Sequence, residues 1–184
     1  MKQPLLTREV GRWIFGDQLS HYLAARPAYP EALYTLLAHR NFFADGNRAM
    51  EIGAGTGLAT RQLLAFPLHH LDLIEPDPRL ATALLKSLTP VQRKRVTVLQ
   101  QPFETTQYPD NAFDVGFCAT AFHWLEETNA LSRLRQWLKP QGRWAAWWNI
   151  FGDSSHPDAF HLASQSLFEE AFGIPSSARP IPFG

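Results

Sequence analysis

Short apolar runs and amphipathic segments alternate along the middle of the chain. Strands are expected where the apolar runs lie, at about 48–53, 70–75, 95–99, 113–119 and 143–149. Segments with helical periodicity lie between and after them, at about 57–66, 77–87 and 127–138. Strands that alternate with helices in this way imply right-handed crossovers and a mostly parallel sheet. The pattern therefore predicts an α/β fold in three layers, with helices on both faces of a sheet of about five strands.

The two ends of the chain carry a different pattern. Helical periodicity runs over about 16–25 and 31–37, with Arg26-Pro27-Ala28-Tyr29-Pro30 between the two segments. The two prolines favour an extended or turn conformation there. Beyond the fifth strand one more helix fits, at about 158–172, and the last residues look irregular. We therefore expect a helical segment over 1–45, a core over 46–150, and a helix with an irregular tail over 151–184.

The expected fifth strand is apolar on both of its faces. Trp144, Ala146 and Trp148 point one way, whereas Ala145 and Trp147 point the other way. A strand of this kind is usually covered on both sides and is not expected at a bare sheet edge. We therefore expect the tail after it, or a second copy of the chain, to cover this strand.

Composition and charge narrow the class of protein. The chain has 184 residues, of which 45% are hydrophobic and 12% aromatic, and this suits a packed domain rather than a disordered segment. Seventeen Lys and Arg residues balance seventeen Asp and Glu residues. Because nucleic acids bind largely through a cationic surface, we expect no nucleic-acid partner. No stretch approaches the roughly 20 apolar residues that a membrane span needs.

Cysteine and histidine usage adds two further expectations. Cys118 is the single cysteine, so no disulfide forms within the chain and a reducing compartment, the cytoplasm, is favoured. His69 and His70 are adjacent on an expected strand and therefore point to opposite faces. No Cys or His pairs have the spacing of metal ligands, and we expect no metal site.

A glycine-rich turn follows the first expected strand, with Gly53, Gly55 and Gly57 at alternate positions. Glycines in such a turn supply positive φ angles and let a ligand approach the backbone closely. The helix that follows presents unpaired N–H groups and the positive end of its dipole, and Thr56 is a candidate for its N-cap. Glu75 ends the second strand, where an acid can accept hydrogen bonds from the hydroxyls of a ribose.

Two classes of nucleotide-binding domain share these features. The NAD-binding fingerprint spaces its glycines as G-x-G-x-x-G, which leaves room for a pyrophosphate. Here the spacing is G-x-G-x-G, and Glu51 stands two residues before the first glycine. The glycine motif alone does not separate the two classes, and the segments that follow it decide between them.

Several of these segments resemble class I S-adenosylmethionine (SAM)-dependent methyltransferases, in the order in which that family has them. Residues 51–57 resemble its first motif, and Glu75 matches the acid of the second. Residues 103–104, 111–115 and 119–124 resemble the third and fourth motifs, and 138–143 resembles an L-x-P-G-G turn with Gln141 in place of the first glycine. Upstream, Tyr22 and 26–30 resemble the Y…RP-x-YP segment of the type 11, ubiquinone/menaquinone-biosynthesis-like subgroup. The resemblance covers about residues 15–150.

The resemblance implies a fold and a cofactor. It implies a Rossmann-like sheet with strand order 3-2-1-4-5, in which a ligand sits at the carboxyl ends of the first and fourth strands, where the order reverses. The family adds a sixth and a seventh strand, and we expect this chain to lack both, as a fragment, a truncated product or a minimal variant. The cofactor that the resemblance implies is SAM.

The resemblance also assigns roles to particular residues. Glu51 would lie near the methionyl ammonium, and Glu75 would bind the ribose hydroxyls. Arg26 or Tyr22 would meet the carboxylate as part of an N-terminal lid to which Tyr29 also belongs. The remaining cofactor contacts would come from the glycine turn, the adenine side and the end of the fourth strand, and comprise Gly53, Ala54, Gly55, Gly57, Pro76, Pro102, Phe103, Cys118 and Ala119. Pro102 replaces an acid that family members often place before the position of Phe103.

The expected reaction is methyl transfer from SAM to a small-molecule acceptor. Such a reaction depends mainly on alignment of the acceptor with the methyl group. His123, just past the fourth strand, is the candidate general base where the acceptor must lose a proton. The alternative for His123 is a packing or hydrogen-bonding histidine between two aromatic residues. Two rival functions stay open, which are a binding or scaffold protein of the same fold without activity, and a nucleotide-dependent oxidoreductase.

Overall fold

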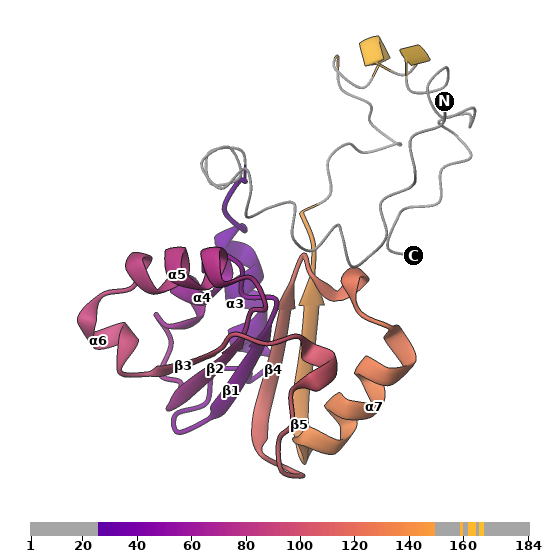
Figure 1. The fold of residues 1–184 in the computed structure, drawn as a ribbon. Helices are drawn as coiled ribbons and strands as arrows, with labels where there is room; N and C mark the ends of the chain where they lie inside the picture. The colour runs from indigo at the N-terminus through magenta and orange to yellow at the C-terminus, as the bar shows by residue number, and fades with distance from the viewer. Residues whose placement is uncertain (1–25, 150–158, 160–161, 165, 168–184) are drawn as a thin grey trace. The chain divides into compact units, whose positions relative to one another are not determined.

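The computed structural model describes residues 26–149 and, beyond them, 159, 162–164, 166 and 167 (Figure 1). Its sheet has five parallel strands in the order β3-β2-β1-β4-β5. The strands are β1 Arg48–Ile52, β2 His70–Ile74, β3 Val96–Leu99, β4 Phe113–Ala119 and β5 Leu138–Trp147. The predicted order is confirmed, and the reversal lies between β1 and β4. The chain leaves the carboxyl ends of these two neighbouring strands toward opposite faces of the sheet, to the helices Leu58–Leu63 and Glu127–Trp137, and a crevice forms where the two connections part.

Helices cover both faces of this sheet, as Figure 1 shows. They are α3 Glu31–His39, α4 Leu58–Leu63, α5 Pro78–Ser87, α6 Pro90–Arg93 and α7 Glu127–Trp137, with the short 3₁₀ turns η1 Phe103–Thr105 and η2 Phe122–Trp124. One apolar cluster joins α3, α4 and α5 to one face of the sheet. A second cluster joins α7 and η1 to the other face. The three-layer α/β fold expected from the sequence is confirmed.

Side chains alternate between these clusters along each strand. In β1, Ala49 belongs to the first cluster, whereas Met50 and Ile52 belong to the second. In β5, Ala145 and Trp147 pack in the first cluster, and Trp144 and Ala146 pack against the second. The expectation that the fifth strand is apolar on both faces is therefore confirmed.

Two local expectations are wrong. Thr56 does not cap the helix after the glycine turn, because the backbone makes a further left-handed turn at Gly57, which has a φ of 82° and is itself the N-cap of α4. The fifth strand begins at Leu138 rather than near 143. It pairs with Phe113 through Leu138 and with Val115 through Arg143, so the residues between form a bulge that a pattern of alternation does not reveal.

The parts of the chain outside the sheet are described incompletely. The helix expected at about 16–25 lies outside the described residues, as does Tyr22. In the segment expected to be helical after 158, the positions that the structure describes are helical. Within the described residues, each helix is too short or too polar to span a membrane.

Candidate functional site

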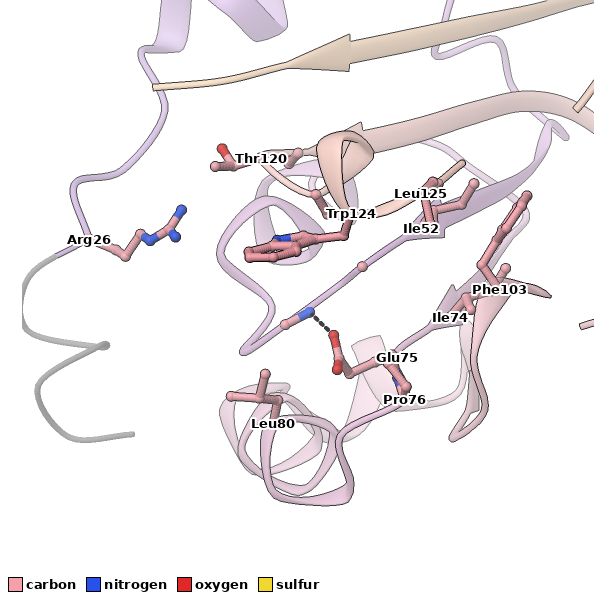
Figure 2. Close-up of a pocket in the computed structure, with 14 residues that line it drawn as sticks. Arg26, Ile52, Ile74, Glu75, Pro76, Leu80, Phe103, Thr120, Trp124 and Leu125 are labelled. Carbon is pink, nitrogen blue, oxygen red and sulfur yellow. Dashed lines mark hydrogen bonds between the residues drawn. The ribbon is translucent and has the colours of Figure 1, made fainter. Parts of the chain in front are cut away.

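A cavity opens at the carboxyl ends of β1, β2 and β4 (Figure 2). Its lining includes seven of the predicted cofactor-binding residues, namely Arg26, Gly53, Gly55, Glu75, Pro76, Phe103 and Ala119. A smaller adjoining cavity shares four of these and adds Glu51 and Ala54. The fold thus brings nine of the predicted residues to one place, at the crevice that the strand order creates.

The glycine turn shapes the floor of this cavity. Gly53 and Gly55 have φ angles of 70° and 57°, in the left-handed region that favours glycine. A Cβ atom on Gly53 would clash with the Cβ atom of Ala121, two residues past the end of β4. The N–H of Gly53 donates to the carbonyl of Ile74 at 2.8 Å, which ties the turn to the end of β2. The left-handed backbone and the close approach of Ala121 therefore require glycine at 53.

Glu75 lies between the glycine turn and the start of α5, with 5% of its surface exposed. Its Oε2 accepts from the N–H of Gly55 at 2.7 Å, the bond drawn in Figure 2, and its Oε1 accepts from the N–H of Asp77 at 2.9 Å. Burial raises the pKa of Glu75, and the two backbone donors oppose that rise. Each carboxylate oxygen can accept further hydrogen bonds. Glu75 is therefore held rigidly and can still bind ligand hydroxyls.

Glu51 is the more deeply buried carboxyl, with 1% of its surface exposed. The hydroxyl of Thr60, in α4, donates to its Oε2 at 2.7 Å. None of the described cations forms an ion pair with it. Burial raises its pKa from 4.5 to about 8, and the nearby charge of Glu75 adds to the rise. Burial thus favours the protonated form of this carboxyl, and a cationic ligand group beside it would favour the ionised form.

The opposite end of the cavity is apolar. Phe103 is 4% exposed and packs edge-on against Trp137 of α7, with ring centroids 5.3 Å apart. Ile74 and Pro76 line the cavity toward Phe103, and Leu80 lines it on the other side of Glu75, as Figure 2 shows. An apolar slot of this kind suits a flat heterocycle.

Three described residues among the predicted cofactor contacts lie outside the lining of both cavities. Cys118 is fully buried in the cluster beneath α7, and burial raises the pKa of its thiol far above the ordinary value. Gly57 faces α5, where an added Cβ would lie 3.1 Å from Leu84 Cγ. Pro102 is the N-cap of η1. Gly57 and Cys118 therefore serve packing in this structure, and Pro102 begins the loop that carries Phe103.

His123 also lies outside the lining of these cavities. The indole N–H of Trp148 donates to its Nδ1 at 3.2 Å, and its ring centroid lies 4.7 Å from that of Trp124. Because tryptophan can only donate, the neutral imidazole carries its proton on Nε2. A base needs a ring nitrogen with an available lone pair. The geometry therefore favours the packing and hydrogen-bonding interpretation of His123 over proton abstraction.

Some site residues were missed by sequence reasoning. Ala121, Leu125 and Leu80 line the cavity, and Thr60 holds Glu51. A weak signal existed for Leu80, because it lies in the first turn of α5, which begins three residues after Glu75. Thr60 had none, since a threonine inside an amphipathic helix is usually an ordinary helix residue.

One further contact ties the segment before α3 to the end of β4. The hydroxyls of Tyr29 and Thr120 lie 2.8 Å apart. Thr120 has a φ of 54°, which is uncommon outside glycine, and its N–H donates to the carbonyl of Trp147 at 2.7 Å. Thr120 also lines the cavity, so this contact brings the Arg26–Pro30 segment to the site. Among the described residues, no group of three or more His, Cys, Asp or Glu side chains could hold a metal ion.

Comparison with known proteins identifies the family. Residues 50–146, more than half of the chain, match the type 11 model of the methyltransferase domain. This range includes β2, β3, β4 and most of β1 and β5, together with the glycine turn and both buried carboxyls. The chain therefore belongs to the SAM-dependent methyltransferase family, and the cofactor of that family is SAM.

Individual relatives agree with this assignment. The chain is 26% identical over 140 residues to an uncharacterized methyltransferase-like protein of Schizosaccharomyces pombe, which covers 76% of this chain and 53% of the relative. It is 30% identical over 136 residues to an uncharacterized methyltransferase of Mycobacterium bovis, at 73% and 51% coverage. A SAM-dependent methyltransferase of Aquifex aeolicus has the same fold, with a TM-score of 0.56 and 19% identity over 75% of this chain and 78% of that one. The chain spans about half the length of the curated relatives it matches.

Proposed function

We propose that this protein binds SAM in the cavity at the carboxyl ends of β1, β2 and β4 and transfers the methyl group to a small-molecule acceptor. The observation that carries the proposal is the pair of buried carboxyls, Glu51 and Glu75, on the two sides of the glycine turn. Burying two such groups without a cation is costly, and a ligand with both a cationic group and hydroxyls offsets that cost.

The cavity offers a partner for each part of SAM. Glu51 would accept from the methionyl ammonium, and Glu75 would accept from the ribose hydroxyls. The apolar slot at Phe103 would hold the adenine, and Arg26, which lines both cavities, would meet the carboxylate. When bound, SAM supplies a sulfonium methyl group that is already electrophilic. The chain's own residues then need mainly to align the acceptor and keep water out.

The acceptor side of the cavity is formed by Thr120, Ala121 and Trp124, beyond the end of β4. These residues offer apolar contact and a single hydroxyl, which suits a small and partly apolar acceptor. Because Nδ1 of His123 is engaged with Trp148, we propose His123 as an orienting residue, with the role of base kept as the alternative to be tested. A His123→Gln variant that keeps its activity and its pH profile would exclude the base role.

The proposal extends to the cellular compartment and to the oligomeric state. We place the protein in the cytoplasm, on the ground that its single cysteine, Cys118, is buried in the core.

Association of two copies through β5 or the tail after it is also proposed, because β5 is the last strand of the described sheet and is apolar on both faces. Light scattering at two concentrations tests the association, and a monomer at both would contradict it.

Calorimetry on the full chain tests the cofactor assignment. Wild-type protein is titrated with SAM, S-adenosylhomocysteine and NAD, and Glu75→Ala is expected to weaken S-adenosylhomocysteine binding by about 10- to 150-fold, because hydrogen bonds to a charged acceptor are lost. Glu75→Gln separates charge from hydrogen bonding, and Glu127→Ala is the control, since Glu127 is exposed at the start of α7. Thermal unfolding establishes that each variant is folded at the temperature of titration.

The outcomes of this titration separate the rival functions. Binding of SAM together with methylation of an acceptor in a screen with labelled SAM supports the proposal. Binding of SAM without turnover of any acceptor supports a scaffold, and binding of NAD in place of SAM supports an oxidoreductase. An unchanged affinity in Glu75→Ala would remove Glu75 from the ribose site.

A further inference from the structure

Arg133 lies on α7, and its guanidinium reaches the loop that carries Phe103. Its Nη1 donates to the carbonyl of Thr106 at 2.7 Å and to that of Phe103 at 3.3 Å, and its Nη2 donates to the carbonyl of Glu104 at 2.9 Å. Three carbonyls of one short turn are thereby held by one side chain from a helix about thirty residues further along the chain. Arg133 is half-buried, so these bonds are partly shielded from water.

The guanidinium also contacts the rings beneath the loop. Its Cζ lies 5.7 Å from the centroid of Phe103 and 5.6 Å from that of Trp137. At these distances a cation is attracted to the face of an aromatic ring. Arg133 therefore holds both the backbone of the loop and the side chain that the loop sends into the cavity.

The loop also contacts α7 through the packing of the Phe103 ring on Trp137. The hydroxyl of Thr106 donates to the carbonyl of Pro102 at 3.0 Å and accepts from the amide of Gln101 at 3.2 Å, and these groups belong to the loop and the residue before it. Such local bonds set the internal shape of the loop, whereas the bonds from Arg133 fix its backbone to α7. The planar, five-donor guanidinium is suited to bridging several carbonyls, whereas a lysine ammonium acts as a point charge.

We propose that Arg133 is a positioning residue for the base end of the cofactor, and that it sets the selectivity of the site for adenine by holding Phe103 and the loop 102–106 against α7. This inference rests on the proposed function, because it takes the slot at Phe103 as the adenine site. Without Arg133 the loop would have to be ordered when the ligand binds, at a cost in affinity. Its backbone groups would also present a less defined edge to the base.

The test compares two ligands that differ in the base alone. S-adenosylhomocysteine and S-inosylhomocysteine are titrated into the full chain and into Arg133→Ala, Arg133→Lys and the control Arg135→Ala. Arg135 is exposed on the same helix, so its substitution makes the same change of charge without touching the loop. Thermal unfolding is recorded for every variant.

Arg133→Ala is expected to weaken S-adenosylhomocysteine binding by about 5- to 30-fold. The ratio of the two dissociation constants, inosyl over adenosyl, is expected to fall toward one. Arg133→Lys keeps a charge near the rings but cannot bridge the three carbonyls, so it is expected to lose most of this selectivity as well while remaining folded. Arg135→Ala is expected to match the wild type in both measurements.

A purely structural role would give a different result. It would lower the melting temperature and leave the ratio of dissociation constants of the folded protein unchanged, and that outcome in Arg133→Lys would overturn the inference. Wild-type protein that binds neither SAM nor S-adenosylhomocysteine would instead overturn the proposed function. The two failures are therefore distinguishable.

Discussion

Two acids toward the amino ends of the strands, Asp72 and Asp114, differ from the two carboxyls of the cavity, Glu51 and Glu75, in the charge of their partners. Toward the amino ends of the strands, Asp72 is paired with Arg48 at 2.8 Å and Asp114 with Lys139 at 2.6 Å. Burial would raise the pKa of Asp114, but the ammonium of Lys139 and the N–H of Arg48 outweigh it and hold this pKa below the ordinary value. These acids have cationic partners within the described chain and contribute to the stability of the sheet.

Toward the carboxyl ends, Glu51 and Glu75 are buried with neutral donors. A threonine hydroxyl and two backbone N–H groups are their described hydrogen-bond partners. Their pKa values are accordingly raised by burial rather than lowered. The contrast indicates that Asp72 and Asp114 contribute to the stability of the sheet, whereas Glu51 and Glu75 keep an electrostatic requirement that a cationic ligand would meet. Asp77, beside Glu75, already has a cation in Arg79.

The largest expected effect is at the amino end. Arg48→Met leaves the buried carboxyl of Asp72 without its main cation, and we expect the free energy of unfolding to fall by about 2–3 kcal/mol, less than for a fully buried pair because Arg48 is half-exposed. Urea denaturation measures the change. Arg143→Met, at an exposed position of β5, is the control. An equal loss of S-adenosylhomocysteine affinity in Arg48→Met and Glu51→Gln would contradict the distinction between acids that stabilise the sheet and acids that bind the ligand.

Glu51→Gln is expected to have the opposite effect on stability in the absence of ligand. The pKa of Glu51 is about 8 in the folded chain against an ordinary value of 4.5. Between these pH values the folded state binds the proton more tightly, so wild-type stability falls as the pH rises toward 8. Glutamine does not titrate, and its advantage should grow over this range to about 1–3 kcal/mol.

Thermal and urea unfolding of the Glu51→Gln variant at several pH values checks this prediction. Glu127→Gln serves as the control, because Glu127 is exposed. A difference between wild type and Glu51→Gln that stays constant from pH 5 to pH 8 would show that Glu51 is ionised in the ligand-free protein.

Ligand binding should also depend on pH through Glu51, but with the opposite sign: affinity should rise as the pH rises, whereas stability falls. A bound ammonium favours the ionised form of Glu51, so binding of S-adenosylhomocysteine should release a proton. Affinity should then rise by up to about tenfold per pH unit between pH 6 and 7.5. Calorimetry in buffers of different ionisation enthalpy counts the protons. The Glu51→Gln variant is the control, and its affinity is expected not to change with pH. A wild-type affinity that does not change with pH would show that Glu51 does not bind the ammonium.

The smallest expected effect comes from the neutral donor. Thr60→Val removes the hydroxyl that stabilises the ionised form of Glu51, so the pKa of this carboxyl should rise further. We expect S-adenosylhomocysteine binding at pH 7 to weaken by about 3- to 10-fold and to recover at higher pH. Thr82→Val is the control, since the hydroxyl of Thr82 bonds only within α5. A loss that persists at high pH would indicate a packing effect instead.

The sequence alone determined the order of the elements and the chemistry at the strand ends. The bounds of β4 agree with the expected 113–119, and both carboxyls lie at strand ends as expected. These features depend on local rules, because alternation, glycine content and the position of an acid after a strand are properties of neighbouring residues. The strand order, which is also as expected, was implied by the family resemblance. The family resemblance added the cofactor and the roles of individual residues.

The tertiary structure decided what depends on residues far apart in the chain. The neutral surroundings of Glu51, the contact of Gly53 with Ala121, and the hold of Arg133 on the Phe103 loop join positions that no periodicity connects. The bond between Trp148 and His123 likewise joins two positions 25 residues apart, and it bears on the proposed role of the histidine. The physical reason is that burial and partner choice set the charge and orientation of a side chain, and both are properties of the packed chain rather than of its local sequence.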